Sequence, residues 1–223
     1  MRLASGSAGE GTGPTAAPVP AGRDHEGASA PHSSLRRSAR CHAAILESTV
    51  ELLAESGFAG LTVEGVAARA GVGKSTIYRH WRSKAELVIE AFGSLIHTAP
   101  PVHTGDLRTD LVERVRTVIA VISQPPLAPI LPSLLDAAER DPELAELHRR
   151  FTAQRRRTLL DLLDAGVAAG TVLPGTDVEL VADLLAGPVF YRRLISRAPL
   201  GPAFADRLVD TLLPLIAGDP AAP

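Results

Sequence analysis

Apolar residues recur at three- and four-residue steps along most of the chain, a period typical of amphipathic α-helices. Gly71 and the Ala99-Pro100-Pro101 segment interrupt the pattern in the first half. A Ser-x-x-Glu capping box at Ser83 marks the start of another helix. Four helices are expected before the Ala-Pro-Pro boundary: one ending at about Ser56, then Thr62–Ala70, Lys74–Trp81, and one opened by Ser83–Glu86.

The second half repeats the helical pattern, with Pro and Gly between the elements. We find no strand pair and no internal repeat, so the sequence predicts an all-α fold of about nine helices. An N-terminal three-helix domain and a C-terminal helical bundle are expected. The predicted helices of the bundle are Leu107–Ser123, Ala128–Arg140, Pro142–Ala169, Val178–Ser196 and Pro202–Ala217.

Residues 1–35 are rich in Gly, Ala, Ser and Pro and show no helical period. Such a segment cannot offset its ordering entropy by burial, and we expect a disordered tail. Arg36, Arg37 and Arg40 follow. They could reach a DNA backbone or minor groove, or they could be the solvated end of the tail. The domains are then 1–35 (tail), 36–97 and 98–223.

The second and third helices have the outline of a helix-turn-helix, in which two short helices flank a Gly-containing turn. Ala67 is small enough for close helix approach, and Gly71 can adopt the left-handed conformation of a sharp helix exit. Val72 and Ile77 would anchor the third helix. Its other side chains are hydrogen-bond donors, as expected of a helix in a major groove. A plain helical corner is the alternative.

The charge supports this interpretation only locally. The chain has a formal net charge of −2 at pH 7, so its overall electrostatics do not favour nucleic acid. Between Arg36 and His97, however, the sequence contains eight Arg and Lys residues and six Glu. From Arg69 through Lys84 there are five basic side chains and no acidic one, which is a surface that could contact phosphates.

The segment Leu61–Trp81 (LTVEGVAARAGVGKSTIYRHW) resembles the signature of the TetR/AcrR family. The match continues through Arg82–Leu87 and includes the upstream helix that leads to Gly57-Phe58. Together it covers about residues 37–97. In layout, Leu185–Leu194 and the residues after it look like the family's last two helices, which form its dimer. The resemblance implies a homodimer on a palindromic DNA operator, usually a repressor that a small molecule releases.

The resemblance also implies roles for individual residues. For Tyr78 and His80, packing is the alternative to the DNA contacts given at the end of this paragraph, and Trp81 is expected in the core. Two positions depart from the family pattern: Gly73 replaces a frequent Ser, and Ser48-Thr49 replace small apolar residues. The implied base-reading residues are Lys74, Ser75, Thr76 and Arg79, and the implied phosphate contacts are Thr62, Tyr78, His80 and Lys84.

A ligand cavity is expected between the fourth helix and the bundle, since pockets between helices are common. Its candidate lining, chosen by position and residue type, is Phe92, His97, Phe151 and Phe190, with core packing as the alternative for each Phe. Arg155-Arg156-Arg157 interrupts the apolar pattern of Pro142–Ala169. Such a run is usually a solvated face, and binding of an anionic ligand is the other interpretation. The sequence does not name the effector.

Val178–Ile195 and Phe204–Ile216 each carry an apolar stripe. Two copies would form a four-helix dimer interface, in which Ala186 and Gly187 permit close approach. Burial of both stripes inside one protomer is the alternative.

Catalytic and metal chemistry have no sequence support. There is no P-loop, Gly-x-Ser-x-Gly or His-Glu-x-x-His motif. His97, His103 and His148 lack metal-ligand spacing, and Cys41 is the single cysteine. We therefore expect no enzyme activity, no metal and no cofactor. No apolar run approaches the length of a membrane span or a secretory signal, so a cytoplasmic protein without membrane contact is expected. A helical ligand-binding or scaffold protein without DNA binding is the principal competitor, ahead of an enzyme.

Overall fold

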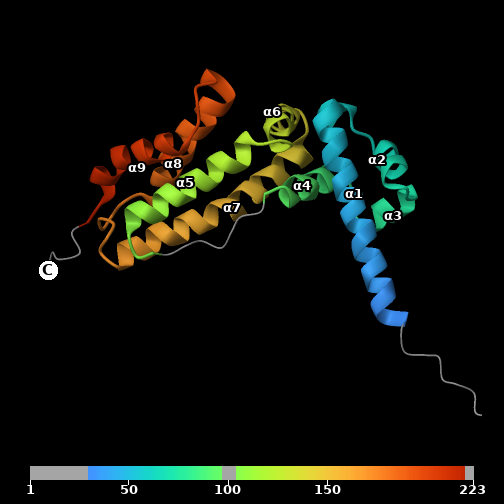
Figure 1. Cartoon of the computed structure of the whole chain (residues 1–223), viewed down its shortest axis with the longest axis horizontal. Coiled ribbons are helices and arrows are strands. Elements are labelled where there is room, and N and C mark those ends of the chain that lie inside the picture. The colour runs from blue at the N-terminus through green and yellow to red at the C-terminus, as the bar shows by residue number, and fades with distance from the viewer. Residues whose placement is uncertain (1–29, 97–103, 219–223) are drawn as a thin grey trace, which may run out of the picture.

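The structure is a computed structural model that describes residues 30–96 and 104–218. In these parts of the chain it is all-α, as predicted, with one isolated β-bridge between Val172 and Ala217. Figure 1 shows α1 to α3 at one end, the long α5 and α7 with α8 and α9 at the other, and α4 and α6 between them. The helices are α1 (Ala30–Gly60), α2 (Val63–Ala70), α3 (Lys74–His80), α4 (Lys84–Ser94), α5 (Leu107–Ser123), α6 (Leu127–Ala138), α7 (Pro142–Ala168), α8 (Val178–Phe190), the π-helix η1 (Tyr191–Ser196) and α9 (Pro202–Ile216).

Helix α1 begins earlier than predicted. The backbone of residues 30–35 is helical, although these residues were expected to belong to a disordered tail. Pro31 lies in the first turn, where a missing N–H costs no helical hydrogen bond, so a Pro-containing composition does not exclude a helix there. Arg36, Arg37 and Arg40 are exposed on α1 and not on an extended arm. Residues 1–29 of the predicted tail lie outside the described residues.

The regular part of α1 ends at Gly57, as the sequence predicts. Gly57 has φ 66° and ψ −177°, a conformation open almost only to glycine, and it separates the last residues of α1 from the long helix. Phe58 then turns into the core, where it is buried. Within α1, the unexpected polar pair Ser48 and Thr49 is also buried, and the Thr49 hydroxyl donates to the Ile45 carbonyl oxygen at 2.7 Å, which satisfies it.

Helices α4 and α6 connect the two ends of the molecule. Both pack against α1 and against α7, so they share surfaces with the N-terminal helices and with the bundle. Apolar residues of α4 and α6, such as Phe92 and Leu134, are buried in these contacts. A movement of α4 or α6 would therefore change contacts with the N-terminal helices and with the bundle.

The sequence predicted one α-helix over Val178–Ser196, and this prediction was wrong. Helix α8 ends at Phe190 and continues as the π-helix η1. Pro188 lies inside the last turn of α8. It has no N–H to donate along the helix and its ring crowds the preceding turn, which favours a local change of hydrogen-bond pattern.

No single helix of the described residues is long and apolar enough to cross a membrane. Helices α5 and α6 meet the criterion only together, and they are bent by 86° at their junction. Each buries several apolar side chains in the core of the protein.

Candidate DNA-binding surface and ligand cavity

Helix α3 is held on the protein by one residue and presents the others outward. Ile77 is 1% exposed and packs in the core, with the half-buried Val72 beside it. Gly71, in the turn between α2 and α3, has φ 67°, the left-handed conformation that the sequence predicts there. Thr76 is half-exposed, and the exposed side chains are Lys74, Ser75, Tyr78, Arg79 and His80.

The turns on either side of α2 explain how this surface is fixed. Thr62 is the N-cap of α2, and its Oγ1 accepts a hydrogen bond from the Gly65 N–H at 3.0 Å. The hydroxyl proton of Thr62 is still available to an acceptor such as a phosphate. Gly73 is the N-cap of α3 and supplies no side-chain hydrogen bond. The departure from the family's usual Ser therefore removes a polar group at this turn.

Two of the five basic residues between Arg69 and Lys84 are paired with carboxylates. The Arg69 guanidinium donates to both oxygens of Glu55, at 2.7 and 2.8 Å, and this pair joins α2 to α1. The Lys74 ammonium lies 2.5 Å from a Glu64 oxygen, and this hydrogen bond raises the pKa of Lys74 and lowers that of Glu64. The positive surface is thus smaller than the sequence count indicated, because the partner acids precede the counted segment.

Lys84 has structural contacts that the sequence did not indicate. Its Nζ donates to the carbonyl oxygens of Phe58 and Leu61, at 3.0 and 3.3 Å, and lies 4.1 Å from the centroid of the Phe58 ring. These contacts join the start of α4 to the end of α1. One of the three N–H donors remains for a phosphate.

Trp81 lies in the core, as predicted, and organises a small cluster. It is 2% exposed, and its indole N–H donates to Glu90 at 2.7 Å. The His42 ring stacks on Trp81 at 4.8 Å and also lies 3.1 Å from a Glu90 oxygen. His80 contacts the edge of His42 at 5.6 Å while its side chain stays exposed. His80 therefore combines packing with access to a surface partner.

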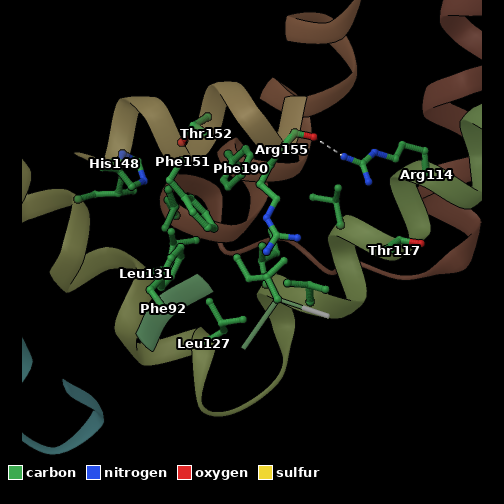
Figure 2. Close-up of a pocket in the computed structure, with 16 residues that line it drawn as sticks. Phe92, Arg114, Thr117, Leu127, Leu131, His148, Phe151, Thr152, Arg155 and Phe190 are labelled. Carbon is green, nitrogen blue, oxygen red and sulfur yellow. Dashed lines mark hydrogen bonds between the residues drawn. The ribbon is translucent and has the colours of Figure 1, made fainter. Parts of the chain in front are cut away.

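A cavity of about 410 Å³ lies between α4, α5, α6, α7 and α8, where the sequence predicted a ligand pocket (Figure 2). Phe92, Phe151 and Phe190 all line it, so three of the four candidate residues come together. Phe92 and Phe151 also pack edge to face at 5.4 Å, so lining and core packing coincide. His97 lies outside the described residues. Half of the lining residues are aliphatic, such as Val118, Val121, Leu127, Leu131 and Leu194.

Sequence reasoning missed the polar part of the wall. Arg114, His148 and Arg155 line the cavity, together with Thr117 and Thr152. The run Arg155-Arg156-Arg157 had been noticed, but its three residues have different roles: Arg155 lines the cavity, Arg156 pairs with Glu179 and Asp183, and Arg157 lies near Asp161 on the surface. Arg114 had no sequence signal, because only the tertiary arrangement brings α5 to the cavity that α7 also lines.

Among the described residues no group of three or more His, Cys, Asp or Glu could hold a metal ion. The architecture is instead that of a DNA-binding protein. An exposed, donor-rich second helix of a helix-turn-helix is attached to a helical domain that contains a cavity.

Comparisons with known proteins identify the family. Residues 45–91 match the family model described as "Bacterial regulatory proteins, tetR family". Residues 101–212 match the model described as "Tetracyclin repressor-like, C-terminal domain". The chain belongs to the TetR family and is a helix-turn-helix transcriptional regulator.

Individual relatives agree over nearly their whole length. The transcriptional regulator YdeS of Bacillus subtilis is 34% identical over 75% of this chain and 85% of its own. The DNA-binding transcriptional repressor TetR of Mycobacteroides abscessus is 33% identical over 77% of this chain and 90% of its own. The crystal structure of the TetR family regulator SCO0332 superposes with a TM-score of 0.62 at 34% identity, covering 82% of this chain and 100% of that one.

Proposed function

We propose that the protein is a ligand-responsive repressor that binds a palindromic operator as a homodimer in the cytoplasm. The observation that carries the proposal is the outward face of α3: a helix anchored by the buried Ile77 exposes Lys74, Ser75, Tyr78, Arg79 and His80. Side chains of this kind donate hydrogen bonds to base edges and phosphates when a helix lies in a major groove.

The contacts divide by position on the helix. In this proposal Lys74, Ser75, Thr76 and Arg79 read base edges. Lys74 first has to leave Glu64, with which it pairs in the absence of DNA. The phosphate contacts come from the rim of the same surface, through Thr62, Tyr78, His80 and the remaining N–H donor of Lys84.

The dimer would form through α8, η1 and α9. Large apolar side chains that stay exposed in the single chain concentrate there, and the clearest are Ile195 at 69% and Leu215 at 70% exposure. Leu180, Leu184 and Tyr191 continue the exposed stripe along α8 and η1. A Cβ built at Gly187 would meet nothing within 4 Å, which leaves space for a close partner helix. Such a dimer can hold two α3 helices about 34 Å apart, one turn of DNA.

Ligand control would act through α4. Phe92 lines the cavity, and Ser83 and Lys84 at the other end of the same helix directly follow the helix-turn-helix. Ser83 caps α4, and Lys84 contacts the carbonyl oxygens at the end of α1. A ligand that prefers one position of α4 would shift the population of dimers towards a spacing that does not fit the operator.

The experiment is selection of bound sequences from random double-stranded DNA by the full chain. We expect an enriched palindrome whose half-sites lie about one helical turn apart. A variant in which Ser75 and Arg79 are both Ala should enrich no sequence. Recovery of the same palindrome by that variant, or failure of the full chain to enrich any sequence, would contradict the proposal.

A further inference from the structure

The cavity of the bundle has a polar end formed by two arginines. Arg114 from α5 and Arg155 from α7 line both the main cavity and a second, polar hollow of about 330 Å³ that Gln154 and Thr158 also line. A third hollow, of about 490 Å³ and bordered by α8, is lined by the same two arginines. The two guanidinium groups therefore lie where an apolar space meets a polar one.

The geometry fixes both arginines in place. Figure 2 shows the Arg155 side chain running into the middle of the cavity. Its Nη2 donates to the carbonyl oxygen of Gly93 on α4 at 3.3 Å. Its guanidinium also lies 5.2 Å from the centroid of the Phe151 ring. Arg114 donates from Nη2 to the Arg155 carbonyl oxygen at 2.9 Å. Both residues are half-buried, Arg114 on α5 and Arg155 on α7.

The electrostatics of this end favour a negative charge. No Asp or Glu is among the described residues that line the main cavity or the polar hollow, and Asp183, which lines the third hollow, is paired with Arg156. Burial lowers the pKa of Arg114, and the positive charge of Arg155 lowers it further. An anion between the two side chains would offset both effects. Arg is also the side chain that binds carboxylates in a two-pronged geometry.

The rest of the cavity has the opposite character. Apart from Thr117, His148 and Thr152, its wall is apolar, from Phe92 on α4 to Leu127 and Leu131 on α6 and Leu194 on η1. At about 410 Å³ it falls within the range of roughly 300–1,000 Å³ of small-molecule sites. A polar or doubly charged ligand would lose hydration along this wall, where few polar side chains offset the loss.

We propose that the effector is an amphipathic organic acid, with an apolar body in the main cavity and one anionic group held by Arg114 and Arg155. This inference rests on the proposed function for its regulatory meaning, but the binding site stands on the cavity alone. A quaternary ammonium or a neutral lipid would lack the group that the two arginines select.

The test uses three ligands with the same ten-carbon chain: decanoate, 1-decanol and decyltrimethylammonium. Their affinities for the full chain are measured by calorimetry without DNA. We expect decanoate to bind about tenfold to a hundredfold more tightly than decanol, as hydrogen bonds to charged groups imply, and decyltrimethylammonium more weakly than both. Equal binding of decanoate and decanol, tighter binding of decyltrimethylammonium, or no binding of decanoate would overturn the proposal.

Two substitutions on α7 make the test specific. Arg155→Met keeps an apolar stem of similar length and should remove the preference for decanoate while decanol still binds, which also shows that the cavity is intact. Arg157→Met changes a surface arginine two residues away, whose side chain is 80% exposed, and should leave the preference unchanged. Arg114→Gln serves if Arg155→Met does not fold. A preference for decanoate that survives both Arg155→Met and Arg114→Gln would contradict the assignment.

The effect of decanoate on operator binding is measured separately. If decanoate binds with the expected selectivity but operator affinity does not change, the site stands and ligand control through this site fails. If the chain binds no operator, the proposed function fails while the calorimetric result is unaffected. The decisive result for the ligand remains the affinity ratio of decanoate to decanol in the parent and in Arg155→Met.

Discussion

The backbone N–H of Phe58, at the end of α1, donates a hydrogen bond to the Oγ of Ser133 on α6, at 3.2 Å. A Cβ at Gly57 would lie 2.6 Å from the same oxygen. The end of α1 thus approaches α6 as closely as glycine permits. Since Leu131 and Leu135 of α6 line the cavity, this contact places the N-terminal helices one helix away from the ligand site.

Gly57→Ala should destabilise the protein by about 1–3 kcal/mol, because alanine disfavours φ 66° and because its Cβ would meet Ser133. The measurement is the free energy of unfolding in urea. Gly57→Ala combined with Ser133→Gly should recover the steric part of the loss but not the part due to φ. Strict additivity of the two single substitutions would show that the side-chain clash contributes nothing.

Arg79→Ala should relax the preference for one base pair in each half-site, at a cost of roughly 1–3 kcal/mol if Arg79 contacts a guanine. The affinities for a set of single-base operator variants measure this. Arg82→Ala is the control, since Arg82 is exposed just beyond α3 and should affect all variants equally. The assignment fails if Arg79→Ala ranks the operator variants as the parent does.

Lys84→Met should lower the melting temperature, since it removes two hydrogen bonds to the carbonyl oxygens of Phe58 and Leu61. If Lys84 also holds a phosphate, the variant should bind every DNA sequence more weakly and show a shallower dependence of affinity on salt. The salt dependence is measured at a temperature at which the variant is fully folded. An unchanged slope there would restrict Lys84 to its structural contacts.

Leu184→Glu should shift the protein from dimer to monomer, because it places a charge in the exposed apolar stripe of α8. Sedimentation velocity measures the change, and operator affinity should fall with it. Ala153→Glu is the matched control, since Ala153 is exposed on α7 outside that stripe. A dimer that tolerates Leu184→Glu as it tolerates Ala153→Glu would assign the interface to another surface.

His148 should make the stability of the protein depend on pH. Burial lowers its pKa below the ordinary value of 6.5. The unfolded chain therefore takes up a proton at this side chain before the folded protein does, and stability falls as the pH drops below about 6.5. His148→Gln should lose less melting temperature than the parent between pH 7.5 and 5.5. An equal loss in both proteins would show that His148 does not titrate as its burial implies.

The sequence was sufficient wherever local rules act. The period of three to four residues predicted the helices, Gly57 and Gly71 adopt the positive φ expected at helix ends, and the Leu61–Trp81 signature identified the family. It also predicted the buried Trp81. These features depend on residues close together in the chain, where backbone sterics and side-chain period decide the outcome.

Local rules failed where the packing of distant segments decides. Charge counting treated Arg69 and Lys74 as unpaired charges, but their partners Glu55 and Glu64 lie 14 and 10 residues upstream and reach them only in the fold. Lys84 likewise finds the end of α1 across 23 to 26 residues.

The sequence by itself determined the family, the helix-turn-helix and the helical architecture, because each is encoded in local patterns. Only the tertiary structure decided the chemistry of the cavity. Arg155 and Arg157 belong to the same Arg run, yet Arg155 lines a cavity and Arg157 lies on a solvated face. The reason is physical. Side chains two residues apart on an α-helix point about 200° apart around its axis, so what each one contacts depends on the helices packed on that side.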